Sequence, residues 1–366
     1  MSNKARNSGF RAGVLPPGRL NNICDVGGVR IAHRTLNDGG RQTGVTAVIP
    51  AAGNLYLSKL QAGCHVINGY GKSCGLIQLS ELGCIETPIV LTNTFAAGTA
   101  FTAVCRRMLE QNPAIGIEPS SVNPVVMECN DGYLNEIRAM HITEDLVSEA
   151  LLEAESLYSE PRKDDAETFA EGAVGAGRGM SCHGLKGGIG SSSRIIALSD
   201  AAYTLGVLVL TNHGKLSELK LGGYRPGSEL AAAAGEDSGF KGSVIVITAT
   251  DAPLSQLQLC RLSRRAQNGL AAAGSVTASG SGEISVAYST RNRLPHYGGQ
   301  MLRHSFLHDD QLDVFFTAVS EAVEEAVISS LFEAESVEGR DGNSRLSLLE
   351  AASRSGLKSA GEIKLC

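Results

Sequence analysis

Apolar residues in this chain gather in short runs separated by polar or glycine-rich turns, and several runs are apolar at almost every position. Runs of this length that are rich in β-branched residues are typical of strands buried on both faces. We predict strands over residues 44–50, 75–79, 89–92, 124–128, 194–198, 203–211, 243–250 and 283–290.

Helical periodicity is clearest in three segments. Residues 97–109 are rich in Ala and follow a Thr-Asn-Thr start signal. A second helix begins near residues 309–310 and carries apolar residues at i, i+3 and i+4 spacing. A third follows the seventh predicted strand, and its start is marked by Asp251 and Pro253. The expected buried face of this third helix begins with Leu254, Leu257 and Cys260.

A weaker helical pattern covers residues 58–63, and the most polar stretch, 159–171, predicts a surface loop. No long low-complexity linker and no internal repeat divides the chain. Strands that are apolar on both faces need helices on one side and a second sheet or more helices on the other. We therefore predict one large layered α/β or α+β domain rather than two independent domains.

Composition and charge exclude several classes of partner. The 366 residues include no Trp and carry a formal net charge of −6, which disfavours nucleic acid and anionic membranes. No apolar run approaches the ~20 residues of a membrane span, and the first residues contain no apolar signal-peptide core. The nine cysteines form no CxxC pair and suit a reducing compartment. We expect a cytoplasmic protein.

The glycine-rich run 175–194 fits no nucleotide-binding motif. Gly179 falls one place early for a dinucleotide fingerprint, no helix is expected after it, and the Walker frame lacks its Gly-Lys-Ser/Thr. Within this run Cys182 and His183 are adjacent, so on an extended chain they point to opposite faces and cannot readily pair. The eight histidines show no metal-ligand spacing, and we predict no metal site.

The Lys241-Gly242 pair precedes a strand whose first residue is Ser243. One interpretation is an ordinary turn. The other is self-cleavage, because glycine tolerates the strained backbone that lets Ser243 Oγ attack the preceding carbonyl. The α-amine freed by such cleavage, with an unperturbed pKa of ~7.7–8.0, can activate the same hydroxyl. The local sequence leaves both interpretations open.

Three other polar motifs stand at strand ends. Ser281 and Glu283 lie two apart on one face at the head of a strand, where they can orient a nucleophile. Asn212 ends another strand, and its amide can donate to an oxyanion. An Asn-Asp-Gly-Tyr turn that ends at Tyr133 follows the strand at 124–128. Each motif is also compatible with an ordinary polar turn.

Together, in this order, the motifs resemble the N-terminal-serine aminopeptidases, which include the L-aminopeptidase/D-amidase-esterase and β-peptidyl aminopeptidase group. Any one segment is weak, but the ordered set is specific and covers nearly the whole chain. The segments are LNNICDVGGVRIAH (20–33), RQTGVTAVIP (41–50), ECNDGYLNEI (128–137), GAGRGM, KGGIGSSSR (186–194), TNHG, GSVIVITATDAPL and SGSGEISVAYST (279–290).

The resemblance implies an α+β fold, a four-layer αββα sandwich of the N-terminal-nucleophile type. It implies one domain that cleaves itself between Gly242 and Ser243 into chains of residues 1–242 and 243–366. The matching site residues are the nucleophile Ser243, its orienting pair Ser281 and Glu283, the oxyanion-hole residues Asn212 and Tyr133, and Glu128 as candidate for binding the substrate ammonium.

The implied activity is hydrolysis of the amide or ester bond after the N-terminal amino acid of a peptide, an amino-acid amide or an ester. It needs no metal or organic cofactor, and we expect a homo-oligomer of cleaved units. Two alternatives remain, namely an acyltransferase of the ornithine acetyltransferase type, which cleaves itself before a Thr, and a non-catalytic binding protein. The chain departs from the family at residues 182–185, where bulkier, often aromatic residues are expected, and it matches weakly after Glu338.

Overall fold

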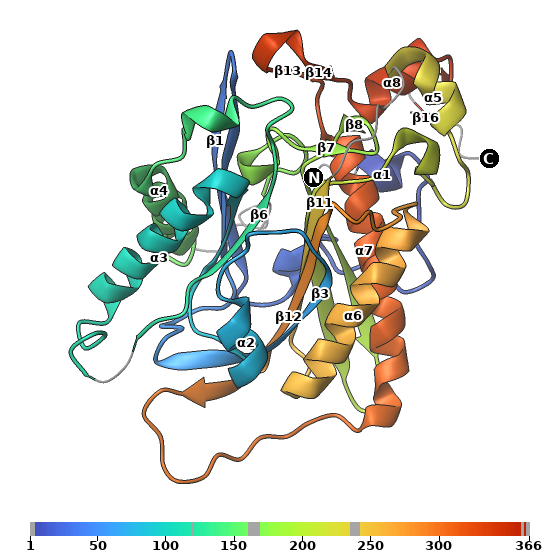
Figure 1. Cartoon of the computed structure of the whole chain (residues 1–366). Coiled ribbons are helices and arrows are strands. Elements are labelled where there is room, and N and C mark those ends of the chain that lie inside the picture. The colour runs from blue at the N-terminus through green and yellow to red at the C-terminus, as the bar shows by residue number, and fades with distance from the viewer. Residues whose placement is uncertain (1–3, 119–120, 160–168, 235–241, 360–361, 364–366) are drawn as a thin grey trace.

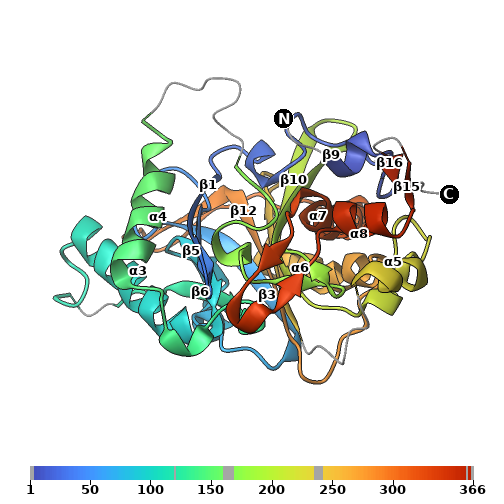
Figure 2. The same cartoon turned by 90° about the horizontal axis from the view of Figure 1, so that it is seen from above.

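Two β-sheets are stacked at the centre of the molecule, and helices cover the outer face of each (Figure 1, Figure 2). The structure is a computed structural model that describes residues 4–118, 121–159, 169–234, 242–359 and 362–363. The first sheet has the strand order β1-β2-β5-β6, and the second has β4-β3-β12-β11-β10-β9. The predicted four-layer αββα sandwich is confirmed.

The strands of the first sheet are β1 (Arg30–Asp38), β2 (Arg41–Ile49), β5 (Ile89–Asn93) and β6 (Val125–Cys129). Those of the second are β4 (Cys84–Ile85), β3 (Ser58–Gly69), β12 (Gly282–Pro295), β11 (Ser243–Thr250), β10 (Ala202–Asn212) and β9 (Ile189–Ala197). The long helices are α3 (Ala97–Gln111), α4 (Glu144–Ser156), α6 (Gln256–Ala272) and α7 (Leu312–Glu333). The shorter helices are α1 (Lys4–Asn7), α2 (Leu76–Leu82), α5 (Gly227–Ala234) and α8 (Leu348–Arg354). Three small hairpins pair β7 (Ser181–Cys182) with β8 (Leu185–Lys186), β13 (Val337–Glu338) with β14 (Ser344–Arg345), and β15 (Lys358–Ser359) with β16 (Glu362–Ile363).

Strand β11 is apolar on both faces because it lies between two cores. Ile245 and Ile247 face the first sheet and pack in one cluster with Leu91 of β5. Val244 and Val246 face the other way, into the cluster that α6 and α7 close. A third cluster lies between the first sheet and helices α3 and α4. Alternation of side chains along each strand thus builds the four layers.

Two predicted elements have the wrong type. Residues 75–79 were expected to form a strand but lie mainly in helix α2, which begins after Gly75 (φ 86°) and ends at Gly83 (φ 65°). Residues 58–63 were expected to be helical but form the start of β3, which pairs along its length with β12. A partner distant in sequence therefore overrides a short local pattern.

The third predicted helix exists but is displaced. Helix α6 begins at Gln256, and the Ser255 side chain accepts a hydrogen bond from the Gln258 N–H as its cap. Leu254 is buried ahead of the helix, whereas Leu257 is 66 % exposed, so the predicted buried face is wrong at that position. Most of the predicted loop at 159–171 lies outside the described residues. Within the described chain, no helix combines the length and apolarity needed to cross a membrane.

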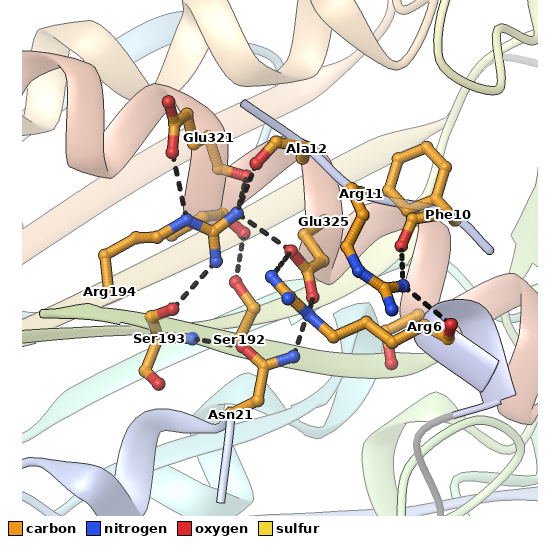
Figure 3. A network of polar contacts seen from close by, with 12 residues as sticks. Arg6, Phe10, Arg11, Ala12, Asn21, Ser192, Ser193, Arg194, Glu321 and Glu325 are labelled. Atoms are coloured by element: carbon orange, nitrogen blue, oxygen red, sulfur yellow. Dashed lines mark hydrogen bonds and ion pairs between the residues drawn. The ribbon is translucent and has the colours of Figure 1, made fainter. Parts of the chain in front are cut away.

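A buried ion-pair network joins the N-terminal segment and β9 to helix α7 (Figure 3). Arg194 of β9 donates from Nη2 to Glu325 Oε2 (2.8 Å) and to the Ala12 carbonyl (2.8 Å), and from Nε to Glu321 Oε2 (3.1 Å). Burial alone would raise the pKa of Glu325, but hydrogen bonds from Arg6 and the charge of Arg194 hold that pKa below its ordinary value. The network connects residues on both sides of the predicted cleavage point.

Candidate active site

Ser243 is the first residue of β11 and lies between two neighbouring strands. Its Cα pairs with Asn212 at the end of β10 and with Gly282 at the start of β12. The Gly282 N–H donates to Ser243 Oγ at 3.2 Å, and Ser243 is 7 % exposed. A Cβ on Gly282 would lie 3.2 Å from this hydroxyl and 2.9 Å from the Gly71 Cα. The position opposite the serine therefore has room only for glycine.

The preceding residue, Gly242, is packed against the end of β10. A Cβ built on Gly242 would lie 1.9 Å from the Asn212 carbonyl oxygen and 2.5 Å from the His213 Cα. Such distances are far inside van der Waals contact. Glycine is therefore required at position 242 by the close approach of two backbones, a cause that the local sequence did not reveal. Lys241 lies outside the described residues.

Glu283 accepts a hydrogen bond on each of its carboxylate oxygens. Ser281 Oγ donates to Oε1 at 2.9 Å, and Thr277 Oγ1 donates to Oε2 at 2.7 Å. Glu283 is 1 % exposed, and hydroxyl groups donate to both of its carboxylate oxygens. The predicted pair is brought together, and Thr277 joins it from a loop that no sequence spacing pointed to.

Asn68 of β3 fixes the loop that carries these donors. Its Nδ2 donates to the carbonyl oxygens of Ala278 and Ser279, each at 3.2 Å, and also to that of Ser281. The loop before β12 is thus fastened to the neighbouring strand. Ser281, which directly precedes β12, therefore lies at the same end of the sheet as Ser243, the first residue of the neighbouring parallel strand β11.

The Asn212 side chain is buried and held from two sides. Its Oδ1 accepts from the Ser181 N–H at 2.9 Å, and its Nδ2 donates to the Asn130 carbonyl at 2.8 Å. Among the described residues this is the one hydrogen bond that Nδ2 donates, which leaves its second N–H for a substrate oxygen. Asn212 therefore has the fixed orientation that an oxyanion donor requires.

Tyr133 is connected to Asn212 indirectly, through Arg345 and Ser181. The Arg345 Cζ lies 3.8 Å from the centroid of the Tyr133 ring, and Arg345 Nε donates to Ser181 Oγ at 3.3 Å. Within the described residues no hydrogen bond joins Tyr133 to Ser243 or Asn212. Arg345 was not predicted, because it belongs to the C-terminal segment where the family resemblance is weak.

Glu128 ends β6 and is 2 % exposed. Its Oε1 accepts from the Lys72 N–H at 2.6 Å, and its Oε2 accepts from the Thr94 hydroxyl. A Cβ on Gly71 would lie 3.5 Å from Glu128 Oε1 and 3.6 Å from the Gly282 Cα. A single glycine therefore separates this carboxylate from the residue that hydrogen-bonds the serine.

Asp131 anchors the turn that supplies Asn130 and Tyr133. Its Oδ2 accepts from Thr43 Oγ1 at 2.5 Å, and its Oδ1 accepts from Asn135 Nδ2 at 3.1 Å. Burial raises the pKa of Asp131 to about 7, although these hydrogen bonds act in the opposite direction. The Asn-Asp-Gly-Tyr sequence is thus a turn, as its residue types predict, and its carboxyl group is part of the support of the site.

A cavity of about 240 Å³ opens beside these residues and is lined in part by Gly242, His213, Ser281 and Glu283. The first three are far apart in sequence, so the cavity exists only because β10, β11 and β12 are neighbours in one sheet. It offers room for a small group next to the Gly242–Ser243 bond.

The expectation that Cys182 and His183 point away from each other is wrong. His183 has φ 49° and Gly184 has φ 73°, so the chain turns sharply between β7 and β8 instead of staying extended. Cys182 Sγ and the ring nitrogens of His183 and His213 offer ligand atoms that all lie within 4.8 Å of one another. The prediction of no metal site considered only the spacing of histidines along the sequence, so it could not take this turn into account.

A four-layer αββα sandwich with a serine at the head of a central strand, beside a buried carboxylate and a fixed amide, is the arrangement of the N-terminal-nucleophile class of hydrolases. The chain belongs to peptidase family S58, which matches residues 21–345. The predicted family and the predicted enzyme class, a serine-type aminopeptidase, are confirmed.

Three relatives show how far the similarity extends. The chain is 34 % identical to beta-peptidyl aminopeptidase BapA of Sphingosinicella microcystinivorans, over 93 % of this chain and 89 % of the relative. The crystal structure of the PH0078 protein from Pyrococcus horikoshii OT3 has a TM-score of 0.88 and 45 % identity, covering 96 % of this chain and 99 % of that one. The L-aminopeptidase D-Ala-esterase/amidase from Ochrobactrum anthropi, described as a prototype of the serine aminopeptidases with a variant Ntn hydrolase fold, has a TM-score of 0.84 and 31 % identity, covering 96 % and 98 %.

Proposed function

We propose that this chain cleaves its own Gly242–Ser243 bond and then removes the N-terminal amino acid from short peptides, amino-acid amides or esters, with Ser243 as the nucleophile. The observation that carries the proposal is the position of Ser243. It heads β11, its Oγ accepts from the Gly282 N–H, and Asn212 and Glu283 flank it on the adjacent strands. One sheet edge thus gathers a nucleophile, an oxyanion donor and a buried carboxylate.

The self-cleavage step follows from this packing. Ser243 Oγ attacks the carbonyl carbon of Gly242, the C–N bond breaks, and the amide becomes an ester on Oγ with a free α-amine on Ser243. Water then hydrolyses the ester and leaves a carboxylate on Gly242. The close fit of Gly242 against Asn212 and His213 fixes the Gly242 carbonyl near Ser243 Oγ. This proximity lowers the barrier to attack by a hydroxyl that is otherwise a weak nucleophile.

In the mature enzyme the free α-amine of Ser243 takes the proton from its own Oγ, directly or through Ser281. The alkoxide attacks the carbonyl that follows the first residue of the substrate, and the free N–H of Asn212 donates to the oxyanion. The leaving amine departs with the proton, and water releases the amino acid from the acyl-enzyme. Glu283 keeps Ser281 oriented and balances the ammonium form of the Ser243 amine.

Glu128 is the proposed binding group for the substrate ammonium. It is buried one glycine away from the nucleophile, and its two present donors leave lone pairs free on a carboxylate that can accept about four hydrogen bonds. An ammonium fixed there places only the first amide bond at Ser243, which is the property of an aminopeptidase. The name of the relative BapA supports β-amino acids, beside α-amino acids, as first residues to test.

We propose that the two cleaved pieces remain associated. Strands β11 and β12 of the second piece pair with β10 and β3 of the first, and Arg194 of the first piece forms an ion pair with Glu325 of α7 in the second. We also propose that this unit is cytoplasmic and assembles into a homo-oligomer. Size-exclusion chromatography with light scattering measures that assembly, and a mass of one cleaved unit would reject it.

Release of p-nitroaniline from L-alanyl, D-alanyl and β-alanyl p-nitroanilides tests the activity. We expect turnover with at least one of these substrates, and no turnover after acetylation of the substrate amine, because Glu128 then has no ammonium to bind. Ser243→Ala is the inactive control, and Ser279→Ala, in the exposed part of the neighbouring loop, is the active one. Absence of hydrolysis together with acetyl transfer between amino acids would instead support the acyltransferase alternative.

A further inference from the structure

Cys182, His183 and His213 form a compact cluster beside the active site. Their ligand atoms all lie within 4.8 Å of one another. Cys182 and His183 are fully buried, and His213 is 1 % exposed. The proposed hydrolytic mechanism uses none of these three side chains.

Three ring nitrogens of this cluster find no hydrogen-bond partner among the residues that the structure describes. They are His183 Nε2, His213 Nδ1 and His213 Nε2. A buried polar atom without a partner typically costs about 1–3 kcal/mol, so native proteins rarely place several together. Three such atoms at one point indicate a group that binds to them.

The hydrogen bond on the other side of His183 fixes its tautomer. His183 Nδ1 lies 3.0 Å from the Lys215 carbonyl oxygen, which can only accept, so Nδ1 carries the proton. His183 Nε2 therefore carries a lone pair. Histidines that bind metals usually show this arrangement, with one ring nitrogen on the metal and the other donating to a carbonyl or carboxylate.

The backbone is shaped to admit these rings. His183 adopts the left-handed region (φ 49°), which is uncommon for a residue other than glycine. A Cβ on Gly214 would lie 2.4 Å from His183 Nδ1, so only glycine permits the ring to sit there. Strain and small residues concentrated around unpaired ligand atoms are typical of a functional site.

We propose that Cys182, His183 and His213 bind a divalent transition-metal ion of the Zn²⁺ type, with a fourth position left for water or another ligand. One thiolate and two imidazoles are ligands that Zn²⁺ prefers, at about 2.0–2.3 Å from the metal. In a tetrahedral site such atoms lie ~3.3–3.7 Å apart, so the cluster needs to contract by about 1 Å. The thiol gives up its proton to solvent when the metal binds.

The metal would fasten the two segments that hold Asn212. Ser181 precedes Cys182 and Asn212 precedes His213, and the Ser181 N–H donates to Asn212 Oδ1 at 2.9 Å. The proposed site therefore supports the oxyanion amide from behind and takes no part in bond cleavage. Metal binding can be measured without any peptidase assay, so its failure is distinguishable from failure of the proposed activity.

Cobalt(II) is the probe for this site. We expect the purified protein, stripped with a chelator and returned to one equivalent of Co²⁺, to retain one ion per chain through gel filtration. Its spectrum should show a thiolate-to-cobalt charge-transfer band and the strong visible bands of tetrahedral Co²⁺. Zn²⁺ should displace the Co²⁺ and remove both signals.

Variants of the ligands decide whether these residues hold the ion. Cys182→Ala should lose the charge-transfer band, and His183→Asn, which tolerates the left-handed backbone, should weaken Co²⁺ binding by about 100-fold or more. Cys84→Ala, at another buried cysteine, is the matched control and should bind as the wild type does. Retention of the charge-transfer band in Cys182→Ala would overturn the proposal. So would a wild-type spectrum without that band, and this measurement stands even if the variants fail to fold.

Discussion

Gly282 lies opposite Ser243 in the parallel pairing of β11 and β12, and its N–H donates to Ser243 Oγ at 3.2 Å. The residues on either side of Gly282 are Ser281 and Glu283, which are hydrogen-bonded to each other. One register between two parallel strands therefore sets the position of the nucleophile relative to its proposed orienting pair. A shift of this register by one residue would change the positions of the Ser281 and Glu283 side chains relative to Ser243.

Gly242→Ala should block or strongly slow self-cleavage. The added Cβ would meet the Asn212 carbonyl oxygen at 1.9 Å, so the Gly242 carbonyl must move away from Ser243 Oγ. Gel electrophoresis of the purified variant should show mainly uncut chain. Gly299→Ala, whose Cβ would have no atom within 4 Å, is the control and should mature normally. Complete cleavage of the Gly242 variant would contradict the proposed geometry.

Thr277→Val should lower kcat about 10-fold or more with a smaller change in KM. The variant keeps the shape of Thr277 but removes one of the two hydroxyl donors to Glu283, and a hydrogen bond to a charged group contributes about 1.5–3 kcal/mol. Steady-state kinetics on the mature protein measure the effect. Ser279→Ala in the same loop should stay near wild type. Equal kinetics of the two variants would show that Thr277 does not support Glu283.

Asn212→Ala should reduce kcat by roughly 10²–10³, the usual loss for one oxyanion-hole donor. KM should change little, because the missing N–H acts on the transition state. Rates are to be expressed per free Ser243 amino terminus, since maturation can also slow. Asn37→Ala, at an exposed position of β1, is the control. A loss below about threefold would remove Asn212 from the oxyanion hole.

Asp131 should make the protein less stable as pH rises. Its pKa is about 7 in the fold against an ordinary value of 3.8, so between these two values the folded state binds more protons than the unfolded state and stability falls with pH. The shift corresponds to a loss of up to about 4 kcal/mol between pH 4 and 8.

Urea unfolding of Asp131→Asn at pH 5 and pH 8, in the uncut Ser243→Ala background, measures this contribution. The variant should gain stability relative to its parent as pH rises, because a neutral amide does not ionise. Asp200→Asn, at an exposed residue, is the control and should follow the parent. Identical pH profiles for the parent and Asp131→Asn would mean that Asp131 is not destabilising when ionised.

Regular patterns in the sequence predicted most of the fold, and short or irregular ones did not. The apolar run at 243–250 and the stripe that begins after 309–310 are long enough to specify a buried strand and a helix, and both are present. At 58–63 and 75–79 the pattern covers only five or six residues. Residues 58–63 form a strand because they pair with β12, and residues 75–79 lie mainly in a helix that is bounded by glycines with positive φ.

The proposed site followed from motifs at strand ends, because sheet pairing brings the ends of neighbouring strands together. Ser243, Asn212 and the Ser281–Glu283 pair are the residues so placed. Thr277 and Arg345 were missed, since each acts through a contact between loops for which the sequence carries no spacing. The convergence of His183 with His213 was missed for the same reason.

N-terminal sequencing of the purified protein shows whether the chain cleaves itself before Ser243. We predict two polypeptides, the second beginning Ser-Val-Ile-Val at Ser243, and a single uncut polypeptide for Ser243→Ala. An active wild-type protein that remains one chain, or a Ser243→Ala protein cut at the same bond, would contradict it.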